Sequence, residues 1–218
     1  MTDAIAAALG AVVLATALAA GFGVLGTRGP HGGRRRVPVA TIVALVIVGV
    51  PTLLQFTVAP ALVDALQRDR ERILSGEVWR IATSLVVQDG GVAGAIVNLL
   101  ALALVGVVAE WTWGAARWVL IALASGLVAQ VWGFVVQPVG AGNSVVVYGL
   151  AASLAVAALA WARGPARILA IVSLAGAAVL LGIGDLHGGA AVIGAALGGI
   201  LVWTEGRRGS GTAKPDFS

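Results

Sequence analysis

Two residues of this sequence have the side chains of a serine nucleophile and its base. Ser144 opens an apolar run in a stretch that reads GNSVVVYGL. His187 opens another apolar run, whereas the second histidine, His31, lies in an arginine-rich connection. A neutral imidazole within hydrogen-bond reach of a hydroxyl is the smallest apparatus that activates a serine. Ser144 and His187 can act together only if the chain brings them to the same place.

The composition of the 218 residues indicates a membrane protein. Hydrophobic residues make up 59% of the chain and charged residues 11%, and the mean hydropathy is +0.99. A soluble core of this size could not bury so many apolar side chains. The net charge of +4 does not indicate a nucleic-acid partner, because the basic residues fall in short clusters between apolar runs. The absence of cysteine excludes disulfides and thiol nucleophiles.

Seven apolar runs are long enough to cross a bilayer, which takes roughly 20 residues of helix. Several of them carry Gly and Ala at three- and four-residue spacing, which suits close packing of helices in lipid. We therefore expect an all-α, polytopic membrane helix bundle. The runs are 4–25, 37–62, 91–109, 118–136, 144–162, 168–184 and 187–203.

Basic residues in the connections predict the orientation of the chain. Arginines follow the first, third, fifth and seventh runs, and these positions all lie on one side of a seven-span chain. The positive-inside rule makes that side cytoplasmic. No basic segment precedes the first apolar run, so we expect that helix to be retained and not cleaved as a signal peptide. We expect an integral multi-pass protein of a bacterial plasma membrane, with its N-terminus outside and its C-terminus cytoplasmic.

The same topology brings the serine and the histidine to one level. Ser144 begins a span that runs inward, and His187 begins the next span that runs in that direction. A histidine inside a membrane is unfavourable unless it faces a partner or a wet cavity. Their two helices can approach closely because each carries small residues at helical spacing. These are Gly149, Ala152, Ser153 and Ala157 on one, and Ala190, Gly194 and Gly198 on the other.

Further motifs carry a resemblance to a known family. Residues 77–83 read EVWRIAT, and Asn98 is followed by two leucines and, twelve positions on, by Glu110. A tyrosine stands four positions after the serine, and glycines follow the histidine at 189, 194 and 198. In these features the sequence resembles the rhomboid intramembrane serine proteases, from about residue 37 to the seventh span. The resemblance implies a six-helix core, to which the first span is an addition.

The resemblance implies roles for five residues. The family uses a serine–histidine dyad to cleave transmembrane segments of membrane proteins, and here the dyad would be Ser144 and His187. Asn98 would help to form the oxyanion hole, and Tyr148 would pack against the catalytic histidine. Gly142 frees the backbone to approach a substrate. The Ser144 N–H, at the start of its helix, lacks a helical acceptor and is a second donor for an oxyanion.

The implied organisation has three parts. Residues 1–36 would form the extra N-terminal transmembrane helix and a basic cytoplasmic loop. Residues 37–205 would form the rhomboid-like membrane core, and residues 206–218 a polar cytoplasmic tail. We expect transmembrane protein substrates and membrane lipid as partners, and no nucleic acid, metal or cofactor.

Three positions depart from the family pattern. Gly94 and Gln88 stand where the family usually has histidines, and Val145 stands where it usually has a glycine after the nucleophile. We expect Gly94 to weaken oxyanion stabilisation, Val145 to crowd the oxyanion hole, and Gln88 to be a candidate substitute donor. Two alternatives therefore stay open: a catalytically inactive rhomboid-like protein that binds client membrane proteins, and a small transporter or scaffold.

Simpler interpretations exist for the same residues. Serine is a preferred helix N-cap, which alone would account for Ser144. His187 could be a loop-end residue, and Asn98 could hydrogen-bond across helices. Asp185 lies two residues before His187, so on a helix we expect it to point away from the imidazole and to act as a helix-start acid.

The second connection, residues 63–87, has four acidic and four basic side chains. This pattern predicts an amphipathic loop on the outer face. Within it, Trp79 and Arg80 are expected to anchor the loop. Glu110, at the inner end of its span, is expected to be tied to a neighbouring loop.

Overall fold

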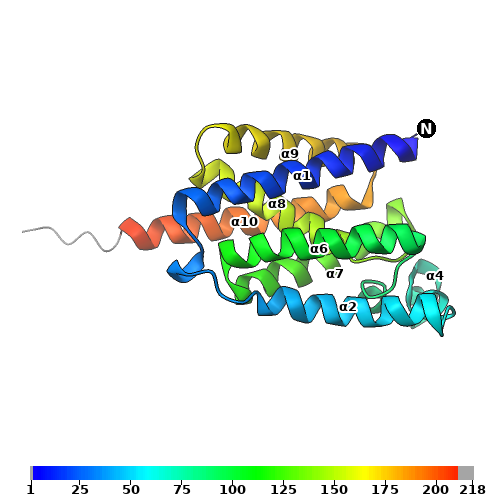
Figure 1. Cartoon of the computed structure of the whole chain (residues 1–218). Coiled ribbons are helices and arrows are strands. Elements are labelled where there is room, and N and C mark those ends of the chain that lie inside the picture. The colour runs from blue at the N-terminus through cyan, green and yellow to red at the C-terminus, as the bar shows by residue number, and fades with distance from the viewer. Residues whose placement is uncertain (1, 211–218) are drawn as a thin grey trace, which may run out of the picture.

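Residues 2–210, which the computed structural model describes, form a bundle of long helices (Figure 1). Seven of the described helices are long and apolar enough to cross a membrane. The chain is therefore a multi-pass membrane protein, and the predicted all-α membrane bundle is confirmed. The seven helices are α1 (Thr2–Arg28), α2 (Val39–Thr57), α6 (Gly91–Trp113), α7 (Ala115–Val136), α8 (Ser144–Trp161), α9 (Pro165–Gly182) and α10 (Leu186–Ser210).

The predicted spans correspond to these helices, and two of the predicted ends differ from the observed ends by more than four residues. The second predicted run continues to residue 62, whereas α2 ends at Thr57. Pro60 follows, and its missing N–H and the restricted residue before it oppose continuation of the helix. At the other end of the chain, α10 continues to Ser210, into the segment that was assigned to the polar tail. Residues 211–218 of that segment lie outside the described residues.

Helix α8 lies at the centre of the bundle and contacts α1, α6, α7, α9 and α10. Its closest neighbour is α10, because small residues face each other between the two helices. A Cβ at Gly194 would overlap the carbonyl group of Gly149, and a Cβ at Gly198 would lie 3.0 Å from the Ser153 Cα. The predicted small faces therefore meet as expected.

The N-terminal helix α1 is packed into this bundle. It lies between α9 and α6 and against α8 (Figure 1). The Ser173 hydroxyl of α9 donates a hydrogen bond to the Val13 carbonyl oxygen at 3.0 Å. A Cβ at Gly21 would lie only 2.7 Å from a methyl group of Val108 on α6. Helix α1 is thus packed closely against α6 and α8, which carry residues of the candidate site.

The outer connection is a compact loop with short helices. Arg80 is 2% exposed and ties the loop together. Its Nη1 donates to the carbonyl oxygens of Asp64 at 2.7 Å and Gln67 at 3.0 Å, and its Nε donates to Glu77 at 2.6 Å. The predicted anchoring is confirmed for Arg80, whereas Trp79 is half exposed. The elements are α3 (Leu62–Leu66), β1 (Arg68–Asp69), α4 (Arg70–Leu74) and α5 (Arg80–Thr83), and β1 pairs antiparallel with β2 (Val139–Gly140).

At the opposite end of the bundle, two carboxylates hold helix ends in place. Glu110 accepts hydrogen bonds from the Ala40 N–H at 3.0 Å and from the Thr41 N–H and hydroxyl at 2.8 Å each. It therefore satisfies N–H groups at the start of α2 that have no helical acceptor. Glu205 of α10 accepts from Arg28 of α1 at 2.9 Å and from Arg117 of α7.

Candidate active site

Ser144 and His187 are in hydrogen-bond contact. The Nε2 atom of His187 lies 2.9 Å from the Ser144 Oγ. Ser144 is the first residue of α8 and His187 the second of α10, so the two side chains meet at the same end of adjacent helices. The Tyr148 ring lies beside the imidazole, with ring centroids 4.4 Å apart and an interplanar angle of 36°. Topology and spacing had predicted these neighbours.

The other imidazole nitrogen also has a partner. Asp185 Oδ1 lies 2.8 Å from His187 Nδ1 and accepts the His187 backbone N–H at 2.8 Å. The expectation that Asp185 points away was wrong, because it assumed one continuous helix. Helix α10 begins only at Leu186, and Gly184 turns the chain with a φ of 76°. Burial alone would raise the pKa of the Asp185 carboxyl, but the hydrogen bonds and charge of His187 together lower that pKa below its ordinary value.

Ser144 and His187 line a cavity of about 450 Å³ at this end of the bundle. The cavity lies between helices α1, α6, α8 and α10 and the loops that precede α6 and α8. Its wall contains several polar side chains, so the cavity can hold water. Non-helical backbone inside a membrane is tolerated where it lines such a water-filled cavity or is buried in protein. These side chains are Arg68, Asp89, Asn98, Gln130 and Gln137.

Two hydrogen-bond donors lie beside the serine. Asn98 and Gly142 line the cavity with Ser144. A Cβ at Gly142, which has a φ of 143°, would lie 3.4 Å from Asn98 Nδ2 and 3.7 Å from Ser144 Oγ. The Ser144 N–H makes no hydrogen bond within residues 2–210. Asn98 Nδ2 donates one hydrogen bond, to Gln88 Oε1 at 2.8 Å, which leaves its second N–H for another acceptor.

The three departures from the family pattern have different surroundings. Val145 is 1% exposed, packs in an apolar cluster with Leu85 and does not line the cavity, so its side chain does not crowd the serine. Gly94 lines the cavity, and a Cβ there would meet no atom within 4 Å. Gln88 is buried and donates to Asn143 Oδ1 at 2.9 Å, so it supports the wall behind Asn98.

Arg68 is a cavity residue whose importance the sequence did not reveal. It is 1% exposed, and its Nε and Nη2 donate to the Gln137 carbonyl oxygen at 3.1 and 2.6 Å, while Nη1 donates to Gln130. Burial lowers the pKa of its guanidinium, and the nearby Asp89 carboxylate offsets only part of that effect. Arg68 thereby fastens the outer loop to the cavity wall. Its partners lie far away in sequence and share no motif with it.

Helix α1 also reaches the site. Ala7, Ala11 and Leu14 line the cavity, and Gly10 lies against the Tyr148 hydroxyl, where a Cβ would overlap the oxygen. Helix α1 therefore contributes to the wall beside the serine. The sequence predicted that a first transmembrane helix exists, but it did not predict that this helix lines the cavity.

Comparison with known proteins gives a partial match. Over 93 residues, which are 42% of this chain, the sequence is 36% identical to the rhomboid protease GluP of Bacillus subtilis (strain 168). The match spans 18% of the length of that relative. No family model matches the chain. The similarity to a rhomboid protease agrees with the motif resemblance over less than half of the chain.

No three His, Cys, Asp or Glu side chains within residues 2–210 gather closely enough to hold a metal ion. A hydroxyl in contact with an imidazole, next to two N–H donors, is the arrangement that acyl transfer by a serine requires.

Proposed function

We propose that the protein is a rhomboid-like intramembrane serine endopeptidase, which cleaves transmembrane segments of membrane proteins with a Ser144–His187 dyad. The observation that carries the proposal is the 2.9 Å contact between His187 Nε2 and Ser144 Oγ at the wall of a polar cavity in a membrane bundle. A serine that served only as a helix cap would not need this histidine. The similarity to a rhomboid protease supports the proposal.

In the first half of the reaction, the Ser144 Oγ attacks the scissile carbonyl carbon and transfers its proton to His187 Nε2. The carbonyl oxygen becomes an oxyanion and accepts hydrogen bonds from the Ser144 N–H and from Asn98 Nδ2. When the C–N bond breaks, His187 returns the proton to the leaving amine. The substrate acyl group then remains bound to Ser144 as an ester.

In the second half, water in the cavity hydrolyses this ester. His187 removes a proton from the water, and the same two donors stabilise the second oxyanion. The hydroxyl of Ser144 regains its proton from His187 as the new carboxyl group leaves. Tyr148 limits the rotation of the imidazole throughout, because the two rings are in contact.

The proposed orientation places cleavage near the outer face. The arginine-rich connections lie at the end of the bundle opposite to Ser144 and His187, and the positive-inside rule assigns them to the cytoplasm. The N-terminus is then outside, and the substrates are helices of other membrane proteins that enter the cavity from the bilayer.

The decisive experiment compares wild-type protein with Ser144→Ala and His187→Ala in cleavage of a panel of purified helical membrane proteins. We expect each substitution to reduce cleavage by about 10³-fold or more, and Asn98→Ala to reduce it by about 10²- to 10³-fold. Ser125→Ala is the matched control, because that buried hydroxyl has no hydrogen-bond partner. Equal cleavage by wild type and Ser144→Ala would overturn the proposal.

A serine-reactive fluorophosphonate provides a second readout that needs no substrate. Labelling of Ser144 that depends on His187 is expected for the protease. A folded protein that is not labelled and does not cleave, but captures membrane proteins, would instead support the inactive client-binding alternative.

A further inference from the structure

His187 is held between two oxygen atoms, and the proposed dyad uses only one of them. Asp185 Oδ1 lies 2.8 Å from Nδ1, on the side of the ring opposite to Ser144. We propose that Asp185 is a positioning residue, whose carboxylate fixes the tautomer and the orientation of the imidazole. Its effect on rate rests on the proposed function, whereas its effect on the tautomer does not.

The chemistry of the two nitrogens gives the reason. A neutral imidazole carries one proton, and only the tautomer with that proton on Nδ1 leaves Nε2 free to accept the Ser144 proton. A carboxylate can only accept a hydrogen bond, so the contact with Asp185 selects the Nδ1–H tautomer. The same contact stabilises the imidazolium that forms when Nε2 takes the proton. Asp185 stays ionised and receives no proton in this step.

The direction of the carboxylate is fixed by its backbone. The Asp185 N–H donates to the Leu180 carbonyl oxygen at 2.9 Å, and Trp132 Nε1 donates to the Asp185 carbonyl oxygen at 3.4 Å. The Trp132 ring fits because residue 189 is glycine, where a Cβ would overlap the indole. The turn at Gly184 and these contacts therefore aim the side chain at the imidazole.

A purely structural role is the competing explanation, because Asp185 Oδ1 also accepts the His187 N–H at the start of α10. Asparagine separates the two roles. It caps helices as well as aspartate does, but its amide group can also donate to an unprotonated Nδ1 and so permits the wrong tautomer. Asp185→Asn should therefore keep the helix start and lose the tautomer selection.

The tautomer can be measured directly by ¹⁵N NMR of histidine-labelled protein. The chain has two histidines, so a His31→Gln background leaves only the signals of His187. We expect the Nδ1–H tautomer to dominate with Asp185 and the Nε2–H tautomer to increase at least severalfold in Asp185→Asn. Identical tautomer populations in the two proteins would overturn the inference, whether or not the protein is a protease.

The effect of Asp185 on the reactivity of Ser144 is measured as the rate at which a fluorophosphonate labels that serine. In Asp185→Asn we expect the maximal labelling rate to fall about 10- to 100-fold, less than the roughly 10⁴-fold seen for a buried triad aspartate, because the Asp185 side chain is 23% exposed. The half-saturating probe concentration should not change, and the melting temperature should fall less than in Asp185→Ala, because asparagine keeps the bond to the His187 N–H but not the carboxylate charge. Asp185→Ser, which also caps but is too short to reach Nδ1, should show the same loss.

The outcomes separate the two proposals. An unchanged labelling rate in Asp185→Asn overturns the positioning role and leaves the protease intact. Absence of labelling in the wild type overturns the protease, and the NMR measurement then still decides the role of Asp185.

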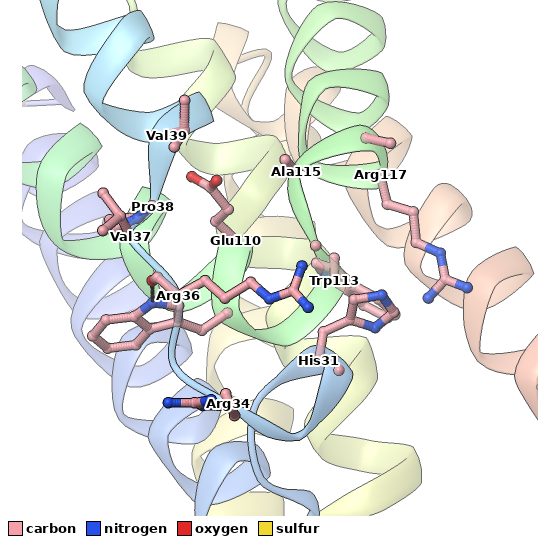
Figure 2. Close-up of a pocket in the computed structure, with 14 residues that line it drawn as sticks. His31, Arg34, Arg36, Val37, Pro38, Val39, Glu110, Trp113, Ala115 and Arg117 are labelled. Carbon is pink, nitrogen blue, oxygen red and sulfur yellow. Dashed lines mark hydrogen bonds between the residues drawn. The ribbon is translucent and has the colours of Figure 1, made fainter.

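A second inference comes from the opposite end of the bundle. A cavity of about 550 Å³ lies there between the start of α2, the end of α6 and the start of α7 (Figure 2). Glu110 in its wall is engaged by three donors from α2, and Arg117 is paired with Glu205. By contrast, the guanidinium groups of Arg34 and Arg36 make no hydrogen bond or ion pair within residues 2–210.

The depth of this cavity indicates its ligand. Helix α2 begins at Val39 and α6 ends at Trp113, so the cavity lies where membrane spans end and phospholipid head groups begin. Figure 2 shows Arg34 and Arg36 on the connection that borders the cavity, with Arg36 extended across it. We infer, independently of the proposed function, that the cavity binds the phosphate of an anionic phospholipid.

Lipid titration of the detergent-solubilised full-length protein tests this site. We expect phosphatidylglycerol to raise the melting temperature more than phosphatidylcholine does, and its apparent affinity to fall about tenfold in Arg34→Gln/Arg36→Gln. The control is Arg163→Gln/Arg167→Gln, which removes the same charge at the same end of the bundle but outside the cavity. An equal loss in both double variants would overturn the site. Equal stabilisation by inorganic phosphate would overturn the lipid as its source.

Discussion

The interface between α8 and α10 differs from the interface between α2 and α6 in the atoms that make its closest contact. Between α8 and α10, Gly194 lies directly on the Gly149 carbonyl group, so backbone touches backbone. Between α2 and α6, the Thr41 side chain covers Gly106 and its hydroxyl donates to Glu110. The closest contact between α8 and α10 is therefore made by backbone atoms, which cannot rotate away. The closest contact between α2 and α6 is made by a side chain, which can change its rotamer.

This difference indicates which part of the bundle sets the catalytic geometry. Of the residues in the α8 span, 67% are buried inside the bundle, against 22% of those in the α2 span. An apolar cavity of about 500 Å³ lies between α2 and α7. The distance between Ser144 and His187 is therefore set by the tight α8–α10 interface, and small shifts of α2 should leave it unchanged. Glycine-to-alanine substitutions at the two interfaces test this comparison.

Gly194→Ala should have the largest effect. Its Cβ would overlap backbone atoms of Gly149, which cannot rotate away, so the helices must separate. We expect a loss of about 3 kcal/mol of unfolding free energy, at the upper end for overpacking, and loss of Ser144 labelling. Denaturant unfolding in mixed micelles and fluorophosphonate labelling measure the two effects.

The control for this substitution is Gly199→Ala on the same helix, where a Cβ meets no atom within 4 Å. It should leave labelling unchanged and stabilise the helix by up to about 1 kcal/mol. If Gly194→Ala were labelled as fast as Gly199→Ala, the tight interface would not set the geometry of the site.

Gly10→Ala should have an intermediate effect, transmitted through Tyr148. The new Cβ would overlap the Tyr148 hydroxyl oxygen, and the ring that must move lies against His187. We expect the labelling rate to fall about tenfold and the unfolding free energy to fall by about 1 to 2 kcal/mol. Gly26→Ala, on the same helix with open space around it, should leave the labelling rate unchanged and should not lower the unfolding free energy.

Removal of the hydroxyl oxygen makes this prediction specific. In the double variant Gly10→Ala/Tyr148→Phe the overlap is absent, so labelling should recover relative to Gly10→Ala alone. A double-mutant cycle reads this coupling directly. Purely additive effects would show that α1 does not act on the site through Tyr148.

Gly106→Ala should have a smaller effect, confined to stability. The nearest atom to its Cβ is a methyl group of Thr41 at 2.8 Å, and that side chain can rotate. The rotation removes the hydrogen bond to Glu110, worth about 1 kcal/mol, while the Thr41 N–H keeps its bond. Thermal unfolding should shift by a few degrees relative to Gly49→Ala on α2, and Ser144 labelling should not change. A labelling loss as large as for Gly194→Ala would contradict the comparison.

Most of the fold could be predicted because it depends on hydropathy and residue size. The seven spans and the small faces at Gly149 and Gly194 follow from composition at helical spacing. The Ser144–His187 contact follows from counting spans. These are properties of one helix at a time or of chain topology.

The rest of the site depends on single backbone turns and on long-range contacts between loops. Asp185 faces His187 because Gly184 ends the preceding turn in a left-handed conformation, two residues before α10 begins. Arg68 reaches the cavity because β1 pairs with β2. Neither the turn at Gly184 nor the pairing of β1 with β2 produces a periodic pattern in the sequence. The sequence of α1 likewise does not specify which helices it packs against.

The lowered pKa of Asp185 predicts the smallest effect, a pH dependence of stability. A carboxyl with a lowered pKa in the folded state stabilises the fold above its unfolded pKa of about 3.9. This stabilisation is lost as the pH falls through the lower folded value. At pH 7, we therefore expect wild type to exceed Asp185→Ala by about 1 kcal/mol, as is typical for a helix N-cap.

Below about pH 4 this difference should narrow, because protonation weakens the bonds of Asp185 to His187. Thermal unfolding of both proteins from pH 7 to about pH 2.5 measures it. Acidic groups remote from Asp185 are expected to titrate alike in the two proteins, so their contribution cancels in the difference. A difference that stays constant across this range would mean that the ionised carboxylate is not what holds the start of α10 and the imidazole in place.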